Sequence, residues 1–129
     1  MTAVDTNVLL RLITGDNESQ GKRAIAFVES QERIFIPKTV LLELEWVLRS
    51  GYRYSRPRIL EVFQNLLGTR NLEVEDELTV FQAMEWCKNG MDFADSLHLA
   101  SAGSRNFATF DAALRKRALR LRAGRPVAV

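Results

Sequence analysis

Cysteine and histidine are nearly absent from this chain of 129 residues, which has one of each, Cys87 and His98. A single thiol allows no internal disulfide, and the lack of a Cys/His cluster argues against a zinc site. We therefore expect a reducing compartment, the cytoplasm. Cys87 lies in a helical apolar pattern and is interpreted as a core thiol. His98 is interpreted as a packed or water-bonded histidine rather than a base.

Long hydrophobic runs and glycine-rich motifs are also missing. No apolar run approaches the roughly 20 residues that span a bilayer, and no charged-then-apolar leader is visible. Neither a Walker glycine motif nor a nucleophile elbow is present, which argues against P-loop and α/β-hydrolase chemistry. The composition is 47% hydrophobic, so the chain is not disordered. Its length fits one domain over residues 1–129.

The net charge of +2 is small but unevenly distributed. Residues 105–129 contain seven Lys and Arg against one acid, Asp111, so the rest of the chain is net acidic. Of the 18 basic residues 14 are Arg, whose guanidinium matches phosphate geometry. The pattern predicts contact with a polyanion, and a solvated helix face is the alternative. The candidate residues for binding a polyanion are Arg115, Lys116, Arg117, Arg120 and Arg122.

Short apolar runs alternate with amphipathic helical patterns along the whole chain. Strands are expected near residues 3–4, 33–36, 71–74 and 107–110, with a further edge strand over 127–129. Helices are expected over 6–14, 16–30, 39–49, 55–67, 76–88, 92–102 and 112–122, with Asp16 and Asp76 as caps. This alternation predicts an α/β fold with a mainly parallel sheet of 4–5 strands covered on both faces.

Isolated acids recur at the places where strands end. Asp5 and Asp111 each follow a short apolar strand, whereas Glu43, Asp92 and Asp95 lie in or at the start of helices. Parallel strands with right-handed crossovers bring such residues to one edge of the sheet. Helix capping is the simpler reading of Asp5 and of one of the pair Asp92 and Asp95, and an exposed helix position is the simpler reading of Glu43. Several carboxylates together would repel unless a hard divalent cation such as Mg²⁺ lay between them.

Four segments of the chain resemble the acidic motifs of PIN domains. They are Val4-Asp5-Thr6-Asn7-Val8-Leu9-Leu10, Glu43, Asp92-Phe93-Ala94-Asp95 and Ala108-Thr109-Phe110-Asp111. The opening through Thr14-Gly15-Asp16 resembles the VapC toxins of bacterial VapBC toxin–antitoxin pairs. The similarity covers essentially the whole chain.

This resemblance implies a PIN-like three-layer α/β/α fold and Mg²⁺- or Mn²⁺-dependent ribonuclease activity. It also implies a homodimer and inhibition by a cognate VapB-type antitoxin. Carried over residue by residue, the catalytic and metal-binding acids are Asp5, Glu43, Asp95 and Asp111. The residues implied to support the site are Asp92, Thr6, Asn7 and Thr109. An antitoxin tail is expected to place an Arg among the carboxylates. Apolar anchors beside it would dock around Trp46 and Phe63, unless these are core residues.

Other readings of the opening motif are weaker or stay open. A haloacid-dehalogenase-type phosphatase needs a second Asp two residues after Asp5, where Asn7 stands. A receiver domain needs an acidic pair near the first strand, and only Asp5 is there. A metal-dependent DNA nuclease and a PIN-like RNA-binding or scaffold module without catalysis remain alternatives, because the acids alone do not distinguish them.

Overall fold

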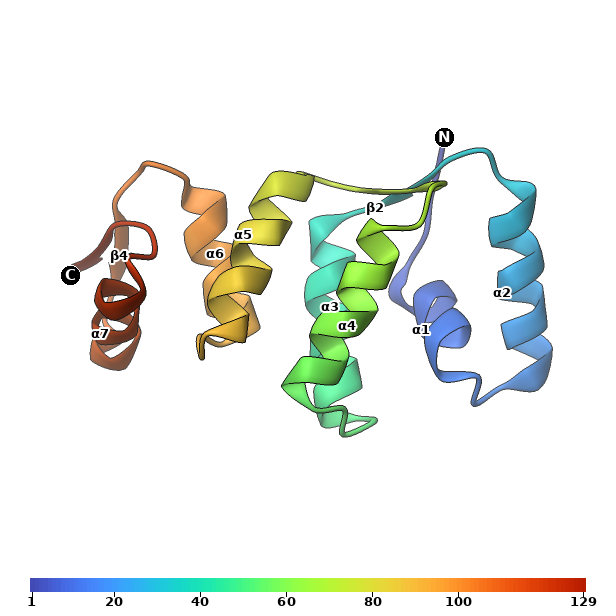
Figure 1. The fold of residues 1–129 in the computed structure, drawn as a ribbon, viewed down its shortest axis with the longest axis horizontal. Helices are drawn as coiled ribbons and strands as arrows, with labels where there is room; N and C mark the ends of the chain where they lie inside the picture. The colour runs from blue at the N-terminus through green and yellow to red at the C-terminus, as the bar shows by residue number, and fades with distance from the viewer. The chain divides into compact units, whose positions relative to one another are not determined.

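The chain folds into two compact units, Met1–Glu77 and Leu78–Val129, in a computed structural model that describes all of residues 1–129. Figure 1 shows the succession of helices along the chain. Each unit has its own helices and its own parallel sheet. The expectation of a single domain stays a prediction.

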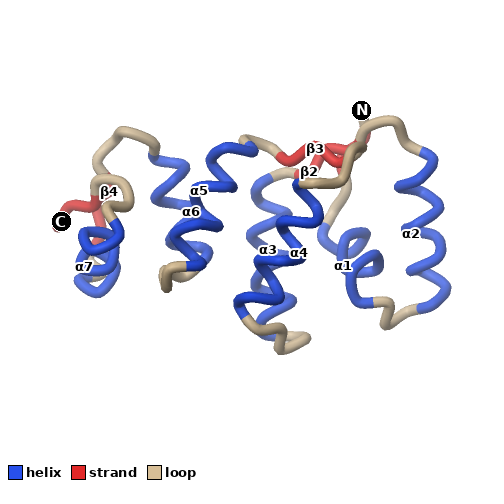
Figure 2. Tube along the Cα trace, in the orientation of Figure 1, coloured by secondary structure: helices blue, strands red, loops and turns tan.

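The first unit is built around a three-stranded parallel sheet in the order β1-β2-β3. Its strands are β1 (Thr2–Ala3), β2 (Ile34–Ile36) and β3 (Leu72–Val74). Its helices are α1 (Thr6–Thr14), α2 (Glu18–Ser30), α3 (Lys38–Ser50) and α4 (Arg56–Leu67). Figure 2 shows β2 and β3 near the ends of α3 and α4. Because the strands are parallel, their carboxyl ends share one edge, from which α1 and α3 start.

Local sequence explains where the first helices begin and end. Asp5 caps α1 by accepting a hydrogen bond from the Val8 amide, and Gly15 ends the helix with a φ of 63°. The sequence suggested Asp16 as the cap of α2, but the cap is Asn17. The Asp16 carboxylate instead accepts hydrogen bonds from Thr14, Arg11 and Tyr52, which leaves the capping position to its neighbour.

The core of the first unit consists of aliphatic side chains and one aromatic ring from the strands and α1, α3 and α4. Its fully buried members include Leu9, Ile34, Ile36, Leu41, Leu44, Leu48 and Phe63. Phe63 is only 1% exposed, so its expected role as a surface anchor for a partner helix is wrong. Trp46 points outward and is 59% exposed. Phe63 is buried because it lies on the same face of α4 as Ile59 and Leu66, which are also buried.

The second unit has three helices and a two-stranded parallel sheet. The helices are α5 (Glu77–Lys88), α6 (Phe93–Ala102) and α7 (Ala112–Leu121), the first beginning at the boundary residue. The strands are β4 (Phe107–Thr109) and β5 (Pro126–Ala128), which confirms the expected C-terminal edge strand. Asp76, expected to cap α5, adopts a φ of 48° and accepts a hydrogen bond from Lys38 Nζ at 2.7 Å.

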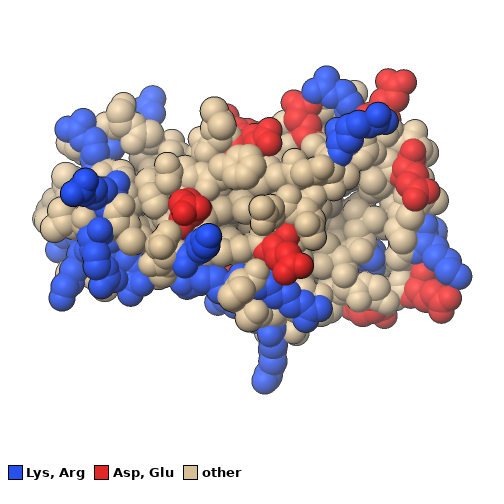
Figure 3. Space-filling model, viewed as in Figure 1, with Lys and Arg blue, Asp and Glu red and all other residues tan.

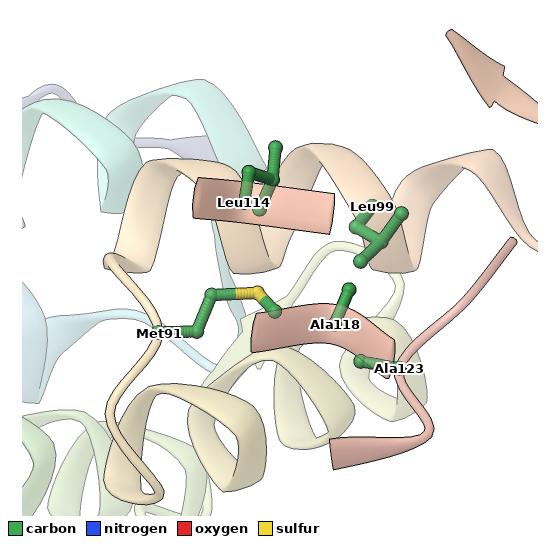
Figure 4. Close-up of a cluster of buried hydrophobic side chains, with 5 residues drawn as sticks. All are labelled: Met91, Leu99, Leu114, Ala118 and Ala123. Atoms are coloured by element: carbon green, nitrogen blue, oxygen red, sulfur yellow. The ribbon is translucent and has the colours of Figure 1, made fainter. Parts of the chain in front are cut away.

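A small hydrophobic cluster holds α6 and α7 together. Figure 4 shows its five side chains, Met91, Leu99, Leu114, Ala118 and Ala123. Gly124 lies against this cluster with a φ of 61°, and a Cβ there would come within 2.7 Å of Leu99. Glycine is therefore required for the chain to turn from α7 into β5. Cys87 is buried, as expected for a core thiol.

The predicted α/β class is confirmed, with five strands in all. The strands form two sheets. Hydrogen bonds join β1, β2 and β3 in one sheet and join β4 to β5 in the other. No helix is long and apolar enough to cross a membrane.

Candidate active site

The first unit brings Asp5 and Glu43 to the same edge of its sheet. Asp5 follows β1, and Glu43 lies in α3, which begins after β2 and Pro37. The pairing of Ala3 with Phe35 sets these two strands in register. Between the acids lies Thr6, which is only 6% exposed and whose hydroxyl donates a hydrogen bond to Glu43 Oε1. Thr6 is thus a positioning residue for Glu43, as its place in the motif implied.

The Asp5 carboxylate has one oxygen engaged and remains exposed. Its Oδ1 accepts from the Val8 amide at 3.2 Å, at the start of α1. Asn7 is exposed beside it. Capping at Asp5 therefore engages one carboxylate oxygen, which orients the side chain, and leaves the other without a hydrogen bond.

The second unit brings together Asp92, Asp95 and Asp111. Asp92 caps α6 through a bond from the Asp95 amide at 3.1 Å. Asp111 caps α7 through a bond from the Leu114 amide at 2.9 Å, and its own amide donates to Thr109 Oγ1 at 3.0 Å. The predicted supporting role of Thr109 thus has a structural basis, since Thr109 orients the residue that bears the carboxylate.

Asp95 carries the electrostatic evidence that these acids interact. Partial burial raises the pKa of its carboxyl group, and the negative charges of Asp92 and Asp111 raise it further. His98, which is exposed and so fits the water-bonded alternative, offsets these effects on the pKa of Asp95. Negative charge therefore accumulates around Asp95, which is the situation that a bound cation relieves.

The donor chemistry of these residues fits a hard divalent cation. All the donors are carboxylate oxygens with hydroxyl neighbours, the set that Mg²⁺ and Mn²⁺ prefer over thiol and imidazole ligands. The structure holds no group of three or more His, Cys, Asp or Glu side chains arranged to bind a metal ion. Of the four predicted acids, Asp5 and Glu43 lie in the first unit, and Asp95 and Asp111 lie in the second.

The basic residues of α7 divide into two kinds. Arg115 donates to the Thr109 carbonyl at 2.8 Å, and Arg117 donates to the Gly90 carbonyl, so both help to fix loops. Lys116, Arg120 and Arg122 are exposed. Figure 3 shows Lys and Arg gathered over the part of the molecule that contains α7. Of the five candidates for RNA binding, these three are free to meet a polyanion.

Sequence reasoning missed two polar features of α3 and the loop after it. Glu45 is only 6% exposed and pairs with Arg49 at 2.8 Å. The spacing of four residues between an acid and an Arg would have indicated this pair. In the following loop, the Tyr54 ring lies under the guanidinium of Arg58 from α4, 3.7 Å from the ring centre. The alternation of Arg and Tyr over residues 52–58 was the available signal.

Comparison with known proteins gives the same outline. The PIN domain family matches residues 2–119, which include every strand but β5 and all the acids named above. The chain belongs to the PIN domain family. It is also similar to the VapC ribonuclease of Aquifex aeolicus (strain VF5), with 32% identity over 106 residues. That match covers 79% of this chain and 78% of the relative.

Family membership confirms the resemblance that the four acidic motifs suggested, and with the parallel strands it confirms a PIN-like α/β/α fold. The matched region runs through both compact units. The acids named above lie in both parts of the matched region.

Proposed function

We propose that this PIN-domain protein is a divalent-metal-dependent endoribonuclease toxin of the VapC type that acts in the cytoplasm. The observation that carries the proposal is the group of acids around Asp95, where burial first and then the charges of Asp92 and Asp111 raise the pKa of the Asp95 carboxyl. The ribonuclease name of the relative supports RNA as the substrate. The exposed basic residues of α7 support binding of its phosphates.

Asp5, Asp95 and Asp111 would hold Mg²⁺ or Mn²⁺, with Glu43 as a direct ligand or one acting through water. When bound, such an ion activates a water and stabilises the leaving oxygen in phosphodiester cleavage. The chain's own contribution is positioning. Asp5 and Asp111 are held by amides of the helices they cap, and Glu43 is held by Thr6. Asp92 orients the first turn of α6, from which the Asp95 side chain extends.

The partners follow from the same arrangement of charges. A free nuclease would harm its own cell, so a cognate VapB-type antitoxin is expected to block the acids. An Arg from its tail would pair with the carboxylates and replace the charge of the metal. A homodimer is also proposed, as the resemblance to VapC toxins implies. If an Arg occupies the site, antitoxin affinity should fall as Mn²⁺ rises at constant ionic strength.

Cleavage of a single-stranded RNA by purified protein tests the proposal. Cleavage should require Mg²⁺ or Mn²⁺, stop in EDTA and be lost in Asp95→Asn, whereas Glu61→Gln, an exposed change on α4, should cleave normally. A DNA strand of the same sequence should be cut far more slowly. Equal cleavage of DNA would favour a DNA nuclease. Metal-dependent RNA binding without cleavage would favour the RNA-binding module.

A further inference from the structure

A groove in the first unit opens beside Asp5 and is not used by the proposed chemistry. It lies between α1 and α2 and has a volume of about 630 Å³, within the range of small-ligand pockets. Its polar lining includes Asp5, Asn7, Arg11, Gln20 and Arg23, and an aromatic ring comes from Phe27. The groove thus begins at a carboxylate of the active site and continues along α2.

The face of α2 that lines the groove is set by helical spacing. Gln20, Arg23 and Phe27 are separated by three and four residues, so they project from one side of the helix. Gly21 brings α2 close to α1, since a Cβ there would lie 3.4 Å from the Arg11 carbonyl oxygen. Lys22 and Ile25 belong to the same helix but do not line the groove.

The two arginines of the groove differ in their hydrogen-bond and ion-pair partners. Arg11 donates to Gln20 at 2.6 Å and to Asp16 at 2.7 Å, so its charge is balanced and its position is fixed. Arg23 is exposed and has no hydrogen-bond or ion-pair partner. A guanidinium left unpaired at the edge of a groove is suited to a phosphate, which it binds through two parallel N–H groups.

Phe27 provides a second element of recognition one turn further along. Its ring is 37% exposed although it lines the groove, so an aromatic face is open to a ligand. Nucleobases stack on such rings in proteins that bind single strands, and this contact does not depend on the base. A duplex cannot use it, because its bases are already stacked.

We propose that the groove between α1 and α2 binds a nucleotide of single-stranded RNA next to the scissile phosphate. The phosphate pairs with Arg23 and the base lies against Phe27. This inference rests on the proposed function and specifies its substrate as unpaired RNA. A strand whose phosphate reaches Asp5 enters the groove directly, because Asp5 is part of both.

Binding of a fluorescent eight-nucleotide RNA in EDTA, where no cleavage occurs, tests the proposal. Phe27→Ala should weaken binding on the order of tenfold, and Arg23→Gln should lower the log–log salt slope by roughly 0.7. Ile25→Ala and Lys22→Gln, on the same helix but outside the groove, should bind as the wild type does. For an abasic oligomer, Phe27→Ala should have no effect, while Arg23→Gln keeps its effect on the slope.

The outcomes separate this inference from the proposed function. If the wild type cleaves RNA but Phe27→Ala and Arg23→Gln bind RNA as their controls do, the groove is not part of the RNA site. If the two variants instead lose binding to an acidic peptide or to a protein inhibitor while RNA binding is unchanged, the groove is a protein-docking site. Either result overturns the inference and leaves the nuclease proposal intact.

Discussion

The two compact units hold their acids in different ways. In the first unit the acids are Asp5 and Glu43, and the buried Thr6 hydroxyl donates a hydrogen bond to one of them. In the second unit, burial raises the pKa of Asp95, and the charges of Asp92 and Asp111 raise it further. The first arrangement orients an acid by a hydrogen bond, whereas the second gathers negative charge that a cation would balance.

The units also differ in overall charge. The first contains 10 Lys and Arg against 12 Asp and Glu, and the second contains 8 against 4. The more basic unit therefore holds the most crowded acids. Such a contrast suits a protein that must attract a polyanion and keep a cation site within it.

The largest expected effect tests whether the acids of the two units serve one site. Asp5→Asn and Asp95→Asn should each lower the rate of RNA cleavage by about 100-fold or more, because each removes a metal ligand. The double variant should be little slower than the worse single variant, since residues that act as a unit are not additive. Independent, multiplying losses would show that the two sets of acids act separately.

The basic surface of the second unit gives the next effect in size. Replacing Lys116 and Arg120 together by Gln should lower the log–log salt slope of RNA binding by roughly 1.4, two phosphate contacts on a single strand. Arg117→Gln should change this slope less and instead lower the free energy of unfolding by about 1 kcal/mol, because its guanidinium bonds the Gly90 carbonyl. An unchanged slope in the double variant would mean that Lys116 and Arg120 belong to a solvated helix face and do not bind RNA.

A smaller effect tests the ordered pair of the first unit. Thr6→Val should lower the free energy of unfolding by about 1 kcal/mol. The variant loses one hydrogen bond to the Glu43 carboxylate, and water can replace part of that bond. Thr6→Ser keeps the hydroxyl and should recover most of it. In a double-mutant cycle with Glu43→Gln, measured by urea unfolding, zero coupling would mean that the two side chains do not interact.

The smallest effect is the pH dependence of stability that Asp95 confers. The pKa of Asp95 is raised in the folded state. At a pH between the usual carboxyl pKa and the raised one, the folded protein therefore keeps a proton that the unfolded chain has released. Stability from this group is therefore present at low pH and falls as pH rises through the raised pKa. In EDTA, Asp95→Asn should flatten the profile of unfolding free energy against pH, and a profile that matches the wild type would remove the electrostatic argument.

The starts of several helices could be predicted from the sequence because helix capping depends on neighbouring residues. The caps at Asp5 and Asp92 were expected and are present, and the capped helices begin where predicted. The core position of Phe63 and the displacement of Asp16 from its cap depend on packing and on Tyr52, a residue 36 positions away. The free Arg23 beside Phe27 was not foreseen either, because it emerges only when α2 packs on α1.

The central claim is that Asp5 and Asp95 are ligands of a divalent ion, and thermal unfolding with Mn²⁺ tests it most directly. At 100 times its dissociation constant, Mn²⁺ should stabilise the wild type by about 2.7 kcal/mol, a rise of several degrees in Tm. Asp5→Asn and Asp95→Asn should both lose this stabilisation, and Glu61→Gln should keep it. If either Asp variant is stabilised by Mn²⁺ as much as the wild type, that residue is not a ligand and the proposed metal site is wrong.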